Sequence, residues 1–194
     1  MWVKNLFDKV GGVILFILLL PLLLIIGLII KAEDGGKVFF LQKRLGKNKE
    51  IFEIYKFRTM KENAPDIRLE DGSTFNSDND PRVTKIGKFL RRTSLDELAQ
   101  IVNIIKGEMS FIGPRPDLPD HLKLYEGEEF KKLLVKPGIT GYAQVNGRND
   151  LPWKARFKYD IYYAENWSIL LDIKIILKTI EIIFTGKGVN RENV

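Results

Sequence analysis

The sequence contains no cysteine and only one histidine, His121. The lack of cysteine excludes disulfides and thiolate chemistry. A Ser-His-Asp triad or a multi-histidine metal site would depend on His121 alone, and we expect this residue to lie at the surface or in packing. The expected catalytic groups are therefore carboxylates, with lysine and arginine as their partners.

The chain also lacks internal repeats and low-complexity tracts. Its 194 residues, of which 45% are hydrophobic, suit one packed domain plus an anchor, and disorder is not expected. Lysine and arginine number 31 against 25 acidic residues, which gives a net charge of +6. This excess favours anionic partners: nucleic acid, phosphorylated ligands or an anionic membrane surface.

Residues 13–30 have no charged or hydrogen-bonding side chain, and this run is about long enough to span a bilayer. A cleaved signal peptide is disfavoured, because no small-residue cleavage site follows the run. A straight spanning helix and a helix that bends at Pro21 and returns to the same face both stay open, since membranes tolerate proline kinks. Basic residues on both sides select no spanning orientation by the positive-inside rule: Lys4, Lys9, Lys31, Lys37, Lys43 and Arg44.

The remaining patterns predict an α+β fold that is mainly helical. Residues 38–42 and 51–57 are apolar and β-branched or aromatic, which predicts a small β-hairpin. A polar surface loop is expected over 61–80 and turns over 137–147. Helices are expected over 94–106, 121–134, 152–165 and 169–184. The last of these is either a core helix or an amphipathic helix in the membrane interface.

Asp96 and Glu97 are the central candidates for chemistry. In one interpretation Ser94 and Glu97 form a capping box at the start of a helix, and the acidic residues simply suit its dipole. In the other, Arg91 and Arg92 just upstream make a cationic helix start where carboxylates can hold Mg²⁺ and face a phosphate. A carboxylate can also attack phosphorus to form an acyl phosphate.

Three further segments place cations where a diphosphate could bind. Strand alternation puts Lys56 and Arg58 on one face, either as a solvated strand end or as a grip on phosphate oxygens. Arg115 is fixed between two prolines, which suits recognition but also a plain rigid loop or a ligand for a proline-binding partner. Arg148 in a glycine-flanked loop is either solvated or able to reach a ligand.

The order of these motifs resembles the bacterial sugar transferase family, the monotopic polyprenyl-phosphate phosphoglycosyl transferases. The series is KFRTM at 56–60, DPRVT at 80–84, SLDEL at 94–98, MSFIGPRP at 109–116, KPGITG at 136–141 and QVNGR at 144–148. Leu20 stands before Pro21 where the family commonly has serine. The small size resembles the minimal members, and the nearest resemblance is to the enzymes that initiate bacterial N-linked protein glycosylation.

The resemblance implies a transfer of sugar 1-phosphate, for an N-acetylated amino sugar, from a UDP-sugar to undecaprenyl phosphate with release of UMP. Asp96 would be the nucleophile of a ping-pong mechanism, and Glu97 would hold Mg²⁺. The substrate would be bound by basic side chains: Lys56, Arg58, Arg91, Arg115 and Arg148. These are expectations from the family and not from spacing.

The same resemblance implies an organisation and a location. Residues 1–32 would be a re-entrant membrane anchor, 33–188 a cytoplasmic catalytic domain with membrane-associated helices, and 189–194 a tail. The enzyme would act at the cytoplasmic face of the bacterial inner membrane, with the lipid membrane and no nucleic acid as partner, and a homodimer stays open. The competing interpretation is a membrane-tethered binding protein without catalysis.

Overall fold

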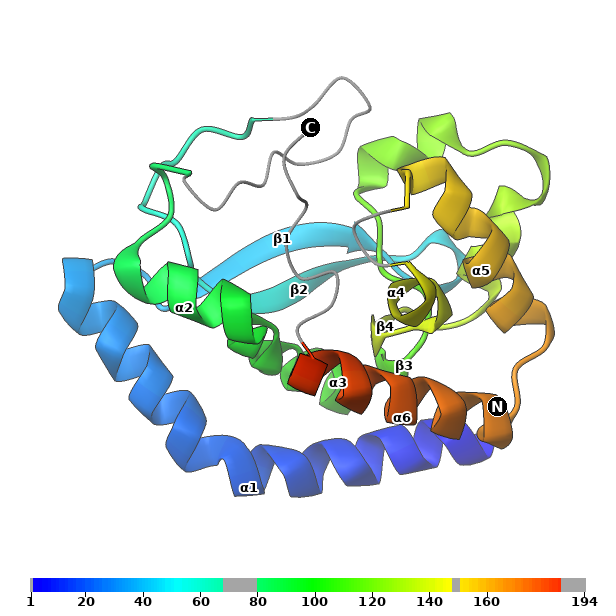
Figure 1. The fold of residues 1–194 in the computed structure, drawn as a ribbon, viewed down its shortest axis with the longest axis horizontal. Helices are drawn as coiled ribbons and strands as arrows, with labels where there is room; N and C mark the ends of the chain where they lie inside the picture. Colours follow the sequence, from blue (N-terminus) through cyan, green and yellow to red (C-terminus); the bar gives the residue numbers. More distant parts are fainter. Residues whose placement is uncertain (1, 68–79, 148–150, 186–194) are drawn as a thin grey trace.

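The computed structural model describes residues 2–67, 80–147 and 151–185. The fold is α+β and mainly helical, as expected, with one long apolar helix at the N-terminus and two small sheets (Figure 1). The elements in chain order are α1 Trp2–Asp34, β1 Phe39–Leu45, η1 Lys47–Lys49, β2 Ile51–Phe57, α2 Lys85–Thr93, η2 Leu95–Gln100, α3 Ile101–Lys106, β3 Ser110–Ile112, η3 Pro119–Leu124, η4 Gly127–Leu134, β4 Gly138–Thr140, α4 Tyr142–Asn146, α5 Trp153–Glu165 and α6 Ile169–Thr185.

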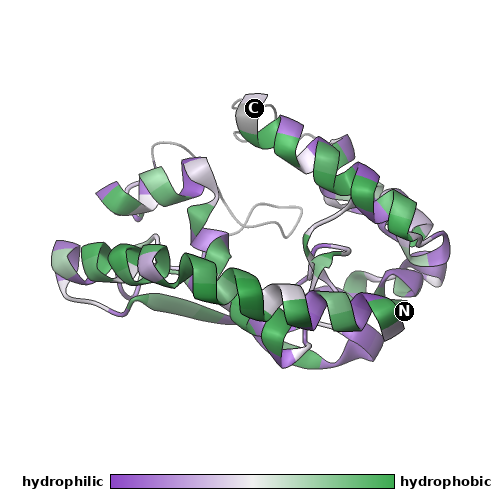
Figure 2. Ribbon diagram, turned by 90° about the horizontal axis from the view of Figure 1, so that it is seen from below, coloured by the Kyte–Doolittle hydropathy of each residue, from purple (hydrophilic) through white to green (hydrophobic). Residues whose placement is uncertain are grey.

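Helix α1 is a single helix of 33 residues with Pro21 inside it, and by length and composition it is able to cross a membrane. It bends beneath the rest of the molecule (Figure 1), and proline is a usual cause of such a bend. Its ribbon is apolar over most of its length (Figure 2). Only Asp8, Gly12, Ile26 and Ile30 are buried. The helix therefore packs on the domain near its two ends and leaves the apolar middle exposed.

The N-terminal end of α1 is fixed by polar contacts that we call the N-terminal clasp: Lys4 and Asp8 with Asp172, Ser110 and Phe111. Lys4 Nζ donates to Asp172 Oδ2 at 2.7 Å. Asp8 Oδ1 accepts from Ser110 Oγ at 3.1 Å and from the backbone N–H of Phe111 at 3.2 Å. The clasp thus joins the start of α1 to β3 and to α6.

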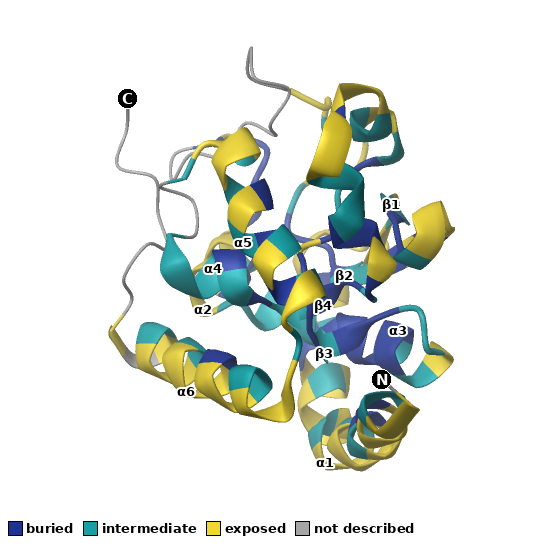
Figure 3. Ribbon diagram, turned by 90° about the vertical axis from the view of Figure 1, so that its right-hand side faces the viewer, coloured by how far each residue is buried: buried dark blue, intermediate teal, exposed yellow. Residues whose placement is uncertain are grey.

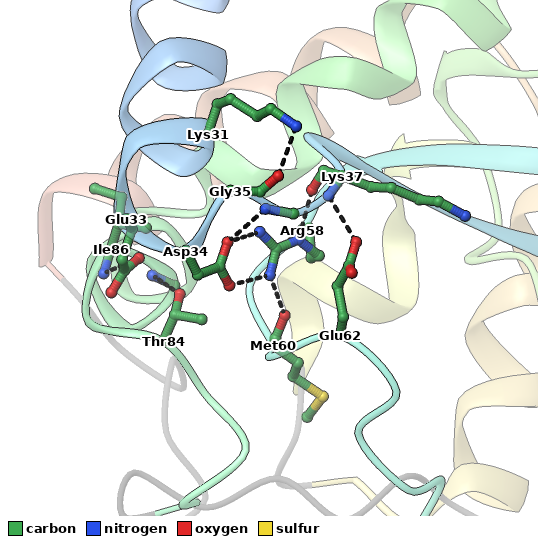
Figure 4. A network of polar contacts seen from close by, with 12 residues as sticks. Lys31, Glu33, Asp34, Gly35, Lys37, Arg58, Met60, Glu62, Thr84 and Ile86 are labelled. Atoms are coloured by element: carbon green, nitrogen blue, oxygen red, sulfur yellow. Dashed lines mark hydrogen bonds and ion pairs between the residues drawn. The ribbon is translucent and has the colours of Figure 1, made fainter.

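The C-terminal end is fixed by a second set, the C-terminal clasp: Glu33 and Asp34 with Arg58 and the first turn of α2 (Figure 4). The Arg58 guanidinium donates to both carboxylate oxygens of Asp34, at 2.7 and 2.5 Å. Glu33 accepts from the backbone N–H groups of Lys85 and Ile86. A carboxylate there satisfies helix-terminal donors and suits the dipole.

The hairpin is confirmed, with a longer first strand than expected. Strands β1 and β2 pair antiparallel from Phe39↔Phe57 to Leu45↔Ile51. The strand end at Phe57 lies in a core cluster with Ile26 and Ile30 of α1, so the hairpin and the anchor share one core. This cluster supports the strand that carries Lys56.

Two short strands, β3 and β4, pair in parallel; turns were expected over β4, and no element was expected over β3. A Cβ on Gly138 would lie 2.1 Å from the backbone nitrogen of Gly113, so glycine alone permits this approach of the two chains. The helix expected over 121–134 is instead two 3₁₀ helices, η3 and η4, while α5 and α6 lie where they were expected. Helix α2 was not expected.

Helix α6 exposes most of its apolar side chains (Figure 3), so it is not a core helix. Ile175 is buried at 1%, but its neighbours Ile176 and Leu177 are 44% and 62% exposed. Helices α6 and α1 both lie along the lower part of the molecule in Figure 1; the Lys4–Asp172 ion pair joins their first turns, and from there the two helices diverge (Figure 2). Together they form one exposed apolar surface, which fits membrane association.

Candidate active site

Asp96 and Glu97 lie in η2, directly after α2, and the capping-box interpretation is wrong. Ser94 has φ 57°, and its backbone N–H ends α2 by donating to Arg91 and Leu90 carbonyl oxygens. Its side chain caps nothing, and residues 94–106 are a 3₁₀ turn followed by α3. The left-handed turn at Ser94 lets Glu97 reach toward β2.

Glu97 is held by two cations from separate parts of the chain. Its Oε1 accepts from Lys56 Nζ at 2.7 Å and from Arg115 Nη2 at 3.0 Å. The Lys56 and Glu97 side chains are mostly buried, at 17% and 18% exposed, while Arg115 is about half exposed. Burial alone would raise the pKa of Glu97, but Arg115 and Lys56 outweigh it and hold that pKa well below its usual range. The two cations therefore favour the ionised form of Glu97, which links Lys56 of β2 to Arg115.

The pKa of Asp96 is shifted in the opposite direction to that of Glu97. Burial raises its pKa, the negative charge of Glu97 raises it further, and Lys56, Arg115 and Arg91 oppose this. Among the described residues its carboxylate makes no hydrogen bond or ion pair. A carboxylate without such a partner, surrounded by cations, is available to a ligand or to phosphorus.

Arg91 reaches the site from the last turn of α2. Its Nε donates to Thr59 Oγ1 at 2.9 Å, and its charge interacts with Asp96. A Cβ on Gly87 would lie 2.1 Å from the Thr59 carbonyl oxygen, so this glycine lets α2 pack directly on the chain after β2. That close packing places Arg91 beside the acidic pair.

Arg115 is presented by a loop that is fixed on both sides. Arg44 Nη1 donates to the Pro116 carbonyl at 3.2 Å, and the Leu45 N–H donates to the Asp117 carbonyl at 2.8 Å. The Asp117 side chain accepts from three donors: Lys132 at 2.7 Å, Tyr125 at 2.6 Å and Trp153 at 3.0 Å. The buried Lys132 ammonium holds the pKa of Asp117 at about 2, against the effect of burial.

The structure thus brings together five of the expected site residues: Lys56, Arg91, Asp96, Glu97 and Arg115. Arg58 is not among them, because it belongs to the C-terminal clasp. The expected contact of Arg148 lies outside the described residues. His121 packs edge-on against Trp153, with ring centroids 5.1 Å apart, which confirms a packing role.

Sequence reasoning missed Asn103, which is fully buried in α3. Its Oδ1 accepts from the Tyr55 N–H at 3.0 Å, and its Nδ2 donates to the Glu53 carbonyl at 2.7 Å. Asn103 therefore fixes the strand that carries Lys56. An amide placed between Val102 and Ile104 was the signal that could have revealed it.

The described residues contain no cluster of three or more His, Cys, Asp or Glu that could hold a metal without help. Mg²⁺ commonly binds through one or two carboxylates plus substrate phosphates. Both hydrogen bonds to Glu97 go to Oε1, so its other oxygen and the Asp96 carboxylate stay uncommitted among the described residues. The acidic pair fits such a shared site.

A carboxylate pair among lysine and arginine side chains, beside an exposed apolar surface, suits an enzyme that acts on an anionic substrate at a membrane. The chain belongs to the bacterial sugar transferase family, whose model matches residues 1–186. The class of this protein is therefore transferase, and a binding protein without catalysis is set aside.

Three similar proteins carry informative names. The exopolysaccharide production protein ExoY of Rhizobium meliloti is 41% identical over 95% of this chain and 87% of its own length. The undecaprenyl-phosphate galactose phosphotransferase of Salmonella typhimurium is 36% identical over 96% of the chain and 41% of its own length. The UDP-N-acetylgalactosamine-undecaprenyl-phosphate N-acetylgalactosaminephosphotransferase of Aeromonas hydrophila is 39% identical over 96% of the chain and 45% of its own length.

Proposed function

We propose that this enzyme transfers a sugar 1-phosphate from a UDP-sugar to undecaprenyl phosphate and releases UMP. The observation that carries the proposal is the Asp96 carboxylate, which has no partner among the described residues and is surrounded by Lys56, Arg91 and Arg115. The names of the two phosphotransferase relatives supply the substrate classes.

The proposed reaction has two displacements at one phosphorus atom. An Asp96 carboxylate oxygen attacks the phosphorus that bears the sugar, and the bond to the bridging oxygen of the diphosphate breaks. UMP leaves with the bonding electron pair, and a sugar-phosphate remains as an acyl phosphate on Asp96. An oxygen of undecaprenyl phosphate then attacks the same phosphorus, and the Asp96 carboxylate is regenerated.

The cations have separate roles in this proposal. Arg115, half exposed and fixed by its loop, binds diphosphate oxygens of the donor. Lys56 and Arg91 stabilise charge around the reacting phosphorus. Glu97 and Asp96 would hold Mg²⁺ with the donor diphosphate, and the metal would supply charge neutralisation there. Arg148 remains a proposed nucleotide-sugar contact from the family motif alone.

We also propose that α1 enters the membrane and returns to the same side, the cytoplasmic face of the bacterial inner membrane. The two clasps support this, because both ends of α1 bind the same domain. A spanning helix would put its ends on opposite sides of about 30 Å of hydrocarbon. Pro21 lies between the clasps, where a reversal requires a bend.

The sugar is the open part of the proposal. The motifs favour an N-acetylated amino sugar, one relative is named for N-acetylgalactosamine and another for galactose. The pathway expected from the motifs is protein glycosylation, whereas a third relative is named for exopolysaccharide production. A panel of UDP-sugars with undecaprenyl phosphate, scored by UMP release, would identify the donor.

The mechanism is tested by omitting the lipid. The full chain is incubated with the active UDP-sugar and Mg²⁺, quenched in acid, and its intact mass is measured. We expect an increase of one phosphosugar, absent in Asp96→Asn, together with exchange of labelled UMP into the donor. If the complete reaction runs but neither signal is found, transfer occurs directly between the substrates and Asp96 is not the nucleophile.

A further inference from the structure

The face of the β-hairpin that carries Lys56 also carries side chains of β1 that the proposed transfer does not use. Phe40 is the strand partner of Lys56, and Gln42 and Arg44 lie on the same face because side chains alternate along a strand. In an antiparallel pair, opposite residues have Cβ atoms about 4.5–5.5 Å apart, and diagonal neighbours lie about 7–8 Å apart. Phe40 is thus a direct neighbour of Lys56, and Gln42 is a diagonal one.

Gln42 offers a hydrogen-bond donor whose orientation is fixed. Arg44 Nη2 donates to Gln42 Oε1 at 2.5 Å, and Arg44 Nη1 donates to the Pro116 carbonyl oxygen. A guanidinium only donates, so the amide turns its oxygen to Arg44 and its NH₂ group away. This Nε2 atom makes no hydrogen bond within the part of the chain that the structure describes. A partly buried amide nitrogen held in this way suits a ligand that supplies an acceptor.

Phe40 offers an apolar ring beside this donor. It is 46% exposed, although Phe52 and Ile54 on the same face are buried at 8% and 3%. Its ring contacts no other aromatic ring among the described residues, whereas the ring of Phe39 stacks on Phe57. An exposed ring next to a cationic phosphate site is a suitable platform for the flat face of a nucleobase.

We propose that Gln42 and Phe40 recognise the uracil base of the donor nucleotide. Gln42 Nε2 donates to uracil O4, and the Phe40 ring stacks on the base. Cytosine has an amino group in place of O4, so it sets N–H donors against the N–H donors of Gln42. The two side chains therefore select uridine nucleotides over cytidine nucleotides.

The surroundings place a nucleotide within reach of both side chains. Arg44 links Gln42 to the loop that presents Arg115, and Arg115 binds the donor diphosphate in the proposed transfer. One apolar ring and one amide donor match a flat base with a carbonyl group better than a sugar ring, whose several hydroxyls each need a polar partner. The inference rests on the proposed function, because it names the residues that read the base of the UDP-sugar.

Nucleotides without the sugar test recognition of the base alone. The full chain in neutral detergent with Mg²⁺ is titrated with UDP and with CDP, and Kd is measured by isothermal titration calorimetry. The two nucleotides carry the same ribose and phosphates and differ only in the donors and acceptors of the base. We expect UDP to bind about tenfold more tightly than CDP, which is the effect of about one hydrogen bond.

Gln42→Glu is the decisive variant. Its carboxylate still accepts from Arg44 but has no N–H group, so it accepts from the cytosine amino group and repels uracil O4. We expect UDP to bind about tenfold more weakly and the preference to reverse toward CDP. A residue that only supports the hairpin would change the affinity for both nucleotides alike.

Two adjacent phenylalanines provide a variant and its matched control. Phe40→Leu stays apolar but removes the aromatic face, so UDP and CDP should both bind about tenfold more weakly. Phe39 is 47% exposed on the opposite face of the hairpin. Phe39→Leu should therefore bind both nucleotides as the unmodified chain does.

The proposal is overturned if the unmodified chain binds UDP and CDP equally, or if folded Gln42→Glu keeps the uridine preference. Unchanged binding of UDP to Phe40→Leu also overturns it. The comparison of UDP with CDP on the unmodified chain needs no variant, so it decides even where a variant fails to fold. Equal binding would leave the proposed transfer intact, whereas binding of neither nucleotide would overturn the donor class and this inference together.

Discussion

Asp96 and Glu97 are sequence neighbours whose carboxyl groups meet opposite electrostatic conditions. Glu97 accepts hydrogen bonds from Lys56 and Arg115, which lower its pKa despite its burial. Asp96 lacks such bonds in the described residues, and burial beside an anion raises its pKa. Environments that push two carboxyl groups apart in this way assign them different tasks. We assign organisation of the site to Glu97 and the chemical step to Asp96.

Asp96→Asn should abolish turnover, by more than about a thousandfold, because an amide cannot accept the phosphosugar. In the unmodified chain the pKa of Asp96 is raised, so the ionised carboxylate lowers the free energy of unfolding at neutral pH. The asparagine variant lacks this charge and should melt at an unchanged or higher temperature. Turnover and thermal melts in the same detergent check both parts. Retained turnover in a well-folded variant would exclude the covalent role.

The rate should fall on the acid side at a pH above the ordinary aspartate pKa of about 3.9. The ionised form is the nucleophile, and it is lost as pH falls through the raised pKa of Asp96. In Glu97→Gln the neighbouring anion is gone, so the acid limb should move to lower pH. Profiles of kcat against pH for both proteins test this. An acid limb that stays in place would mean that Asp96 does not control the rate.

Glu97→Gln should also change stability and metal use. It leaves Lys56 and Arg115 without their shared anion, and a loss of about 1–3 kcal/mol is expected. Since the pKa of Glu97 is lowered, that stability is present above the unfolded-state pKa and disappears as pH falls through the folded value. If Glu97 helps to hold Mg²⁺, the Mg²⁺ titration of the rate should shift to higher concentration. An unchanged titration would leave Glu97 with the structural role alone.

At the scale of elements, β2 provides a matched pair of variants. Lys56 and Arg58 are two residues apart, but Lys56 contacts Glu97 whereas Arg58 contacts Asp34 and the Lys37 and Met60 carbonyls. Arg58→Gln should cost about 2–3 kcal/mol of stability with near-normal donor KM. Lys56→Gln should lower kcat/KM about 10–100-fold. Thermal melts and steady-state kinetics distinguish the two variants. A loss of kcat/KM in Arg58→Gln with little loss of stability would show that Arg58 belongs to the active site.

Elements with long, regular patterns were predictable from the sequence. The hairpin follows from β-branched and aromatic runs, and α5 and α6 follow from their length. Strands β3 and β4 have three residues each, and their pairing depends on Gly113 and Gly138 meeting across the fold. No local pattern reports such a contact. The 3₁₀ start of the helix expected over 94–106 was missed because Ser94 looks like a helix cap but adopts a left-handed turn.

The site residues could be predicted where a basic residue lies in one of the sequence motifs and its partner is the acidic pair. They could not be predicted where the partner comes from a distant part of the chain. Lys56, Arg91 and Arg115 meet the acidic pair as the motifs suggest. Arg58 shares the strand face of Lys56, yet Asp34 from the end of the anchor binds it. Alternation along a strand gives a face but not the partner, which depends on where α1 returns to the domain.

For the whole molecule, the prediction is that both ends of α1 lie on the cytoplasmic side. The natural chain has no cysteine, so Val3→Cys and Lys37→Cys each introduce one exposed thiol without disturbing Lys4. An impermeant maleimide should label neither in intact cells and both after permeabilisation. Labelling of either thiol from outside would show that α1 spans the membrane.

The two clasps also differ in when they can close during synthesis. Arg58 follows Asp34 by 24 residues, so the C-terminal clasp can form soon after the anchor leaves the ribosome. Asp172 follows Lys4 by 168 residues, and at about 5–20 residues per second it emerges roughly 6–23 seconds after Arg58. The nascent chain is therefore held at one end of its anchor first, and its N-terminus docks only when α6 arrives. Arrested chains with cysteines at positions 4 and 172 should cross-link only when α6 is exposed.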